Sequence, residues 1–166
     1  MQIVIGFSKS NKKLALGSDI IRWYMGTKYS HIYVRIPKEQ TNSISDTIYH
    51  ASAGMVHGMS KTQFDKKHVV IEEFVLEVDT ETYNHILLES QELCGADYGL
   101  LQNLGIVLVQ LLKEAGLTIN NPFISGWNCS EFVAIILLLI HYDVFKELKP
   151  NICTPKDIYL ILKAKF

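Results

Sequence analysis

The feature that most constrains this chain is an unbroken apolar run from Phe132 to Ile140. As a helix its nine residues would rise about 14 Å, whereas a bilayer core needs roughly 20 residues. A helix that is apolar on every side must be covered by other elements. We therefore expect a buried core helix here and no transmembrane span.

Length, charge and cysteine content narrow the class of protein. The 166 residues fit a single domain, 1–166, and sixteen basic against seventeen acidic residues give a net charge of −1. That balance disfavours a nucleic-acid partner, which is bound by neutralising phosphates. Three cysteines with no CxxC pair suit a reducing compartment, and the N-terminus lacks the pattern of a secretory signal. We expect a cytoplasmic protein.

Hydrophobic periodicity predicts strands first and helices later. The expected elements of the first half are a strand over 2–7, a polar loop over 8–13, a helix capped by Ser18 and ended by Gly26, and strands over 31–36, 47–52, around Val56 and over 68–78. Helices should follow from Asp79 or Thr80 to Gly95, over 99–116, from Cys129, and from Pro155 behind a Thr154 cap. This order predicts an α+β fold.

The strand over 31–36 alternates cleanly between two kinds of side chain. Ile32, Val34 and Ile36 share one face, and His31, Tyr33 and Arg35 share the other. Packing on the apolar face therefore does not account for His31.

A cysteine at a helix start is the strongest chemical signal. Asn128 is a good N-cap and Glu131 follows at capping-box spacing, which puts Cys129 at the first helical position. The helix dipole and free N–H groups there would lower the pKa of the thiol and hold an oxyanion. The alternative is a small buried core residue, since free cysteine is often buried.

Such a cysteine needs a base, and the chain offers six histidines. His31 begins one predicted strand, and His50 lies on the next, where it could orient the first imidazole. Both could instead be half-exposed strand residues. The other four, His57, His68, His85 and His141, are expected to be solvated at a loop or on helix surfaces.

Five motifs recur in a recognisable order along the chain. They are a helix ending at Trp23 and Gly26 before Tyr29-Ser30-His31, a polar strand residue at His50, Gly95-Ala-Asp-Tyr-Gly99, Asn128-Cys-Ser-Glu-Phe132, and Thr154-Pro-Lys-Asp-Ile158. Together they resemble the circularly permuted NlpC/P60 group of papain-like cysteine hydrolases, which includes YiiX/YaeF-type bacterial proteins, phage relatives and the lecithin:retinol acyltransferase branch. The resemblance covers residues 18–159, with histidine first and cysteine last. It implies a permuted papain-like fold, an antiparallel sheet packed against helices with the nucleophile at a helix N-terminus.

The resemblance also implies roles for individual residues. Cys129 would be the nucleophile, His31 the general base and His50 the third polar member, with Ser52 on the same strand face as its rival. Substrate contacts are expected from Ser30, Tyr98 and Asn128, the last replacing a tyrosine often found before the cysteine. Glu131 also matches the family, but its capping position explains it structurally.

The expected reaction is hydrolysis of an amide, in a peptide or a cell-wall peptide, through a thioester, with no cofactor and no metal. A wall substrate would require the chain to travel as phage cargo. A second reading is a lipid or ester acyl hydrolase or acyltransferase, in which Leu100–Leu112 would touch an acyl chain or a membrane surface. A third is a non-catalytic binding module or phage structural component. A metal site from His31, His50 and Cys129 would lack a placed carboxylate base.

Overall fold

The computed structural model describes residues 1–12, 16–41, 43–52, 54–97, 99, 105, 109, 112, 116, 117, 119, 126–140 and 142–166. The strands of this part of the chain are β1 (Gln2–Ser10), β2 (His31–Ile36), β3 (Thr47–Ser52), β4 (Met55–Ser60) and β5 (His68–Glu77). The helices are α1 (Leu16–Met25), η1 (Lys38–Gln40), α2 (Lys61–Asp65), α3 (Thr80–Glu92), α5 (Cys129–Ile140), α6 (Tyr142–Phe145) and α7 (Pro155–Lys165). The expectation of an α+β fold is confirmed.

The described strands form one antiparallel sheet in the order β4-β3-β2-β1-β5. Central strand β2 pairs with β1 along most of its length, from His31 opposite Ser8 to Arg35 opposite Val4. With β3 it pairs only over Val34–Ile36. The first residues of β2 therefore lie where β2 and β3 have separated.

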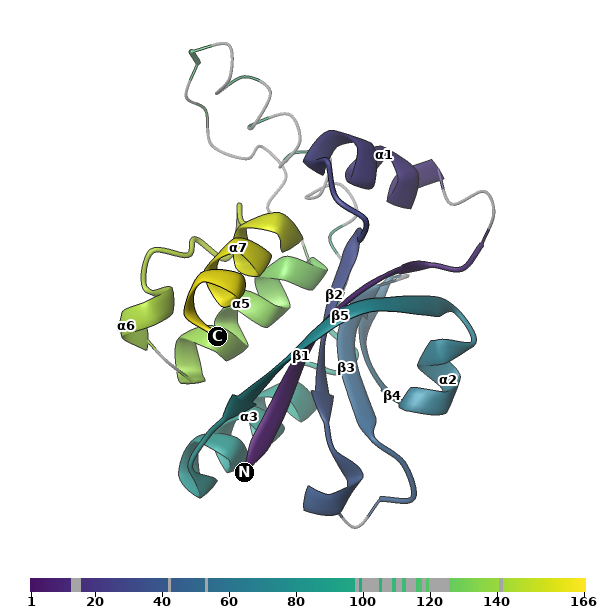
Figure 1. Cartoon of the computed structure of the whole chain (residues 1–166), viewed down its shortest axis with the longest axis vertical. Helices are drawn as coiled ribbons and strands as arrows, with labels where there is room; N and C mark the ends of the chain where they lie inside the picture. The colour runs from purple at the N-terminus through teal and green to yellow at the C-terminus, as the bar shows by residue number, and fades with distance from the viewer. Residues whose placement is uncertain are drawn as a thin grey trace.

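One face of the sheet carries the main core. Helices α5 and α7 lie on this side (Figure 1), and α5 contacts both β2 and β3. Ile32, Val34 and Ile36 point here, fully buried against the apolar residues of α5 such as Phe132. The apolar run from Phe132 to Ile140 is thus covered by a sheet face, as expected.

The opposite face of the sheet curls around the short helix α2. Helix α2 contacts both edge strands, β4 and β5, as well as β3, and Figure 1 shows it across the sheet from α5. Its Phe64 is fully buried and forms a second, smaller cluster with Tyr33 and Ile48. Tyr33 is on this face because it alternates with the core-facing Ile32 and Val34, so the predicted alternation of β2 is confirmed.

Two expectations near the N-terminus are wrong. Strand β1 continues through Ser8–Ser10, which were expected in a polar loop, because their backbone pairs with β5 from Val70 to His68. Helix α1 spans Leu16–Met25, so position 18 lies within the helix and not at its start, where a cap was expected. Helix α2 was also not expected from the sequence; Ser60 caps it by accepting a hydrogen bond from the Gln63 N–H.

The helix ends follow the predicted capping chemistry. Asp79 accepts the Thr82 N–H at the start of α3, and Thr154 and Asp157 form a reciprocal capping box at α7. Gly26 ends α1 with a φ of 63°, which other residues rarely adopt. The helix expected over 99–116, including Leu100–Leu112, lies mostly outside the described residues.

Gly6 leaves room for the aromatic ring of Tyr33 to lie over strand β1. It stands opposite Tyr33 in the β1–β2 register, and a Cβ at this position would lie 2.0 Å from Cζ of the Tyr33 ring. The ring passes over β1 and its hydroxyl donates to Glu73 Oε1 on β5 at 2.7 Å. Arg35 donates to the same carboxylate, and also to Asp46 Oδ2, at 2.7 Å.

Candidate functional site

Cys129 is the first residue of α5, as the capping pattern predicted. The Asn128 side chain caps the helix: its Oδ1 accepts the Glu131 N–H at 2.8 Å. The Ser130 hydroxyl lies 2.8 Å from both that Oδ1 and the Cys153 carbonyl just before α7. These contacts fix the starts of α5 and α7 side by side.

The Cys129 thiol is buried against the sheet, with 6% of the residue exposed. Burial raises the pKa of Cys129 to about 11, while the backbone N–H groups of Ile32, Ser130 and Cys129 itself act to lower it. The expectation that the helix N-terminus lowers the thiol pKa is therefore wrong for the resting structure, because desolvation outweighs the N–H groups. The same N–H groups are suited to stabilising negative charge that forms at this point.

His31 and His50 meet where β2 and β3 separate. Nε2 of His31 lies 2.9 Å from Nδ1 of His50, a hydrogen bond between the two imidazoles. Burial lowers the pKa of both, that of His31 well below its usual range and that of His50 to about 3; each is lowered further by neighbouring histidines. Both rings are therefore neutral near pH 7.

Ser52, the rival to His50, is the last residue of β3. Its backbone carbonyl lies 2.8 Å from Nε2 of His57. Among the described residues, the side chain hydrogen-bonded to His31 is that of His50.

Two further histidines lie beside this pair, and the sequence did not predict that they would. His57 stands opposite His50 in the β3–β4 register, and His68 begins β5. The ring centroids are 5.0 Å apart for His31 and His50, 5.3 Å for His31 and His68, 5.6 Å for His50 and His57, and 5.7 Å for His50 and His68. We call these four residues the histidine cluster. His57 and His68, which were expected to be solvated, are half-buried: the β3–β4 register places His57 opposite His50, and the start of β5 places His68 against His31.

Cys129 and His31 approach β2 from its two faces. The thiol belongs to the main core and faces the N–H of Ile32, whereas the His31 ring packs against Phe64 and His68 on the α2 side. Among the described residues, no hydrogen bond joins the Cys129 thiol to an imidazole. The two groups are neighbours across one stretch of backbone. Catalytic hydrogen bonds are often long or unformed before substrate binds.

The three expected substrate-binding residues lie in different settings. Asn128 is fully buried and its oxygen serves as the N-cap of α5. Ser30 is 7% exposed, and its N–H donates to the Ser8 carbonyl at 3.0 Å. Tyr98 lies outside the described residues.

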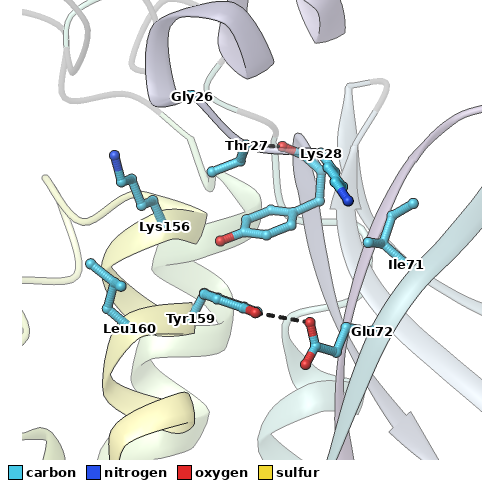
Figure 2. Close-up of a pocket in the computed structure, with 9 residues that line it drawn as sticks. Gly26, Thr27, Lys28, Ile71, Glu72, Lys156, Tyr159 and Leu160 are labelled. Atoms are coloured by element: carbon cyan, nitrogen blue, oxygen red, sulfur yellow. Dashed lines mark hydrogen bonds between the residues drawn. The ribbon is translucent and has the colours of Figure 1, made fainter.

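A pocket of about 450 Å³ opens on the core side of the sheet, between the end of α1, β5 and the start of α7 (Figure 2). The rings of Tyr29 and Tyr159 lie 5.1 Å apart in its wall, and the Tyr159 hydroxyl donates to Glu72 Oε2 at 2.9 Å. Lys28 and Lys156 line it too; in Figure 2 the Lys156 side chain extends away from Glu72. The described lining residues come from the link between α1 and β2, from β5 and from α7, and none of them belongs to α5.

No local sequence pattern pointed to this pocket, because its walls come from three distant segments of the chain. The pocket is lined by both charged and apolar side chains. Burial raises the pKa of Tyr29, and the nearby Tyr159, Glu72 and Asp157 raise it further.

Two searches of the described residues bear on other functions. In that part of the chain, no three or more His, Cys, Asp or Glu side chains are arranged to hold a metal ion. None of the helices seen there has the length and apolar character needed to cross a membrane.

Comparison of the chain with protein-family models, with curated proteins and with solved structures finds no match. What the molecule does must therefore be argued from its own residues.

Proposed function

We propose that this chain is a cysteine hydrolase of the permuted NlpC/P60 type, which cleaves an amide bond in a peptide-like substrate through a thioester. One observation carries the proposal: a thiol at the start of α5 faces the N–H groups of Ile32 and Ser130 on one face of β2, and the hydrogen-bonded pair His31 and His50 lies on the other face. A nucleophile with donors for an oxyanion and an oriented base thus both belong to the first residues of β2.

The proposed reaction starts from a neutral thiol and neutral imidazoles. His31 lies on the other face of β2, so on substrate binding it would take the thiol proton through one water while the sulfur of Cys129 attacks the amide carbonyl. The oxyanion would accept hydrogen bonds from N–H groups at the start of α5. His31 then gives the proton to the leaving nitrogen as the C–N bond breaks. Water attacks the thioester, releasing the acid and restoring the thiol.

His50 would orient the base throughout this cycle. For His31 to accept a proton on Nδ1, its Nε2 must carry hydrogen and donate to Nδ1 of His50. His50 then carries its own proton on Nε2, an atom that is buried and has no partner among the described residues. Because the His31–His50 bond persists when His31 is protonated, it stabilises the charged intermediate of the reaction.

The pocket between α1, β5 and α7 favours an amide over a lipid substrate. Its volume of about 450 Å³ lies in the range of small-molecule sites. Lys28, Glu72 and Lys156 give it ionisable groups that an alkyl chain cannot satisfy but a peptide segment can. A lipid or ester acyl hydrolase would need an apolar channel, for which Leu100–Leu112 remains the candidate.

One observation favours a second function, a non-catalytic binding module. The Cys129 thiol is 6% exposed with a pKa of about 11, properties typical of a structural cysteine. In that case Cys129 fills the core beneath Ile32, and the pocket would be the functional part of the surface.

Acyl-enzyme trapping distinguishes the two. The protein is mixed with activated esters and thioesters that carry either short peptide-like or long alkyl acyl groups, quenched in acid, and mapped by peptide mass spectrometry. We expect an acyl adduct on Cys129, favoured with peptide-like donors, retained in Cys153→Ala and absent in Cys129→Ala. A folded wild-type protein that forms no adduct with any donor would favour the binding module.

A further inference from the structure

The histidine cluster contains more imidazoles than the proposed reaction uses. His31 and His50 account for the base and its partner, whereas His57 and His68 have no assigned role. Of these two, His68 makes the closer ring contacts. Its centroid lies 4.2 Å from that of Phe64 with the planes 17° apart, and 5.3 Å from that of His31 with the planes 20° apart.

Three rings therefore lie nearly parallel on the α2 side of the sheet. Phe64 is fully buried in α2 as part of the second core cluster, and its ring stacks on that of His68. The centroids of His31 and Phe64 are 6.3 Å apart, with their planes 27° apart. Such offset stacks favour one mutual orientation of the rings.

His31 needs a second restraint besides its hydrogen bond. The contact from His31 Nε2 to His50 Nδ1 fixes one nitrogen, but the ring can still pivot about that bond. The His50 ring meets His31 at 80°, at its edge, so it does not define the plane of the His31 ring. The His68 ring, which lies beside that of His31 and nearly parallel to it, restrains that plane.

We propose that His68 is a positioning residue for His31: its ring, which with that of Phe64 lies nearly parallel to the His31 ring, fixes the plane of the His31 imidazole and so keeps the hydrogen bond to His50 that sets its tautomer. This inference rests on the proposed function for its purpose, but the geometry it describes belongs to the free protein. His68 acts only through His31 and touches no reacting atom. Burial, then His50 and His68, lower the pKa of His31, which is consistent with a stack of neutral rings.

The test is the tautomer and titration of His31, followed by ¹⁵N NMR of histidine-labelled protein in a Cys129→Ala background, where no thiol chemistry contributes. His68→Phe keeps a ring against Phe64, whereas His68→Leu and His68→Ala remove it. His85→Ala, at an exposed position of α3, is the matched control. Two ring-free variants are included so that one folded protein can be compared even if the other does not fold.

We expect a single His31 tautomer in wild type, in His68→Phe and in His85→Ala. In His68→Leu or His68→Ala we expect a mixture of tautomers and a raised pKa of His31, because the uncovered ring meets water. The inference is overturned if the ring-free variants keep the wild-type tautomer and pKa, or if His68→Phe disturbs them as much as His68→Ala. None of these outcomes depends on Cys129 being a nucleophile, so failure of the proposed function would be seen separately, by trapping.

Discussion

At the level of single residues, the close approach of the Tyr33 ring to Gly6 predicts a large loss of stability when a side chain is added at position 6. Any Cβ at position 6 would overlap the Tyr33 ring, which is held at its far end by Glu73. We expect Gly6→Ala to lower the free energy of unfolding by about 3 kcal/mol, the upper part of the range for overpacked cores. Urea denaturation followed by circular dichroism measures this loss.

The control is the same change in a Tyr33→Leu background. With the ring gone, alanine at position 6 should be neutral or slightly stabilising, because it loses less backbone entropy on folding than glycine does. Equal losses from Gly6→Ala in both backgrounds would show that the ring does not cause the strain.

Cys129 shows what the sequence can and cannot predict about a residue. Its place at the start of α5 was predictable because capping is local: Asn128 and Glu131 lie within one turn of it. Its pKa was not, because burial under the sheet depends on which strand covers it, and that strand is almost a hundred residues away.

At the level of elements, the start of α5 depends on Asn128. We expect Asn128→Ala to lower the free energy of unfolding by about 2 kcal/mol, because the Glu131 N–H loses its buried acceptor and the Ser130 hydroxyl is left with the Cys153 carbonyl alone. Thermal and urea denaturation measure the loss. Asn128→Ser keeps a capping oxygen and should lose less; equal losses would contradict the capping role.

In the strands too, features set by neighbouring residues were predictable, and features set by distant segments of the chain were not. The bounds of β2 and β3 and the alternation of β2 were predictable from periodicity and from Pro37. The histidine cluster was not, because periodicity assigns faces within one strand but does not reveal that β4 and β5 curl toward each other around α2. His57 and His68 therefore seemed to flank a loop.

At the level of the whole molecule, the buried titratable groups confine stability to a window of pH. The pKa of His50 falls to about 3 from an ordinary value of about 6.5, so between these values the unfolded chain binds the extra proton and stability falls as the pH falls. His31 acts in the same direction. The pKa of Cys129 rises from 9.0 to about 11, so between these values the unfolded chain loses its proton first and stability falls as the pH rises.

We therefore expect a maximum in the free energy of unfolding between about pH 6.5 and pH 9, measured by urea denaturation at a series of pH values. His50→Asn, whose amide can replace Nδ1 as a partner for His31 but cannot ionise, should flatten the acid side alone. Cys129→Ala should flatten the alkaline side alone. Unchanged slopes in both variants would mean that these groups are not desolvated in solution.

The most direct test of the pairing between nucleophile and base is the rate of iodoacetamide modification of each cysteine against pH, read by peptide mass spectrometry in wild type and His31→Ala. Exposed Cys94 serves as a reference that does not involve His31, and buried Cys153 as a control for opening of the core. If His31 takes the thiol proton, Cys129 should be modified at pH 7 faster than Cys153 and about tenfold more slowly in His31→Ala, with Cys94 unchanged. A Cys129 rate that follows ionisation near pH 11 and ignores the loss of His31 would contradict the pairing.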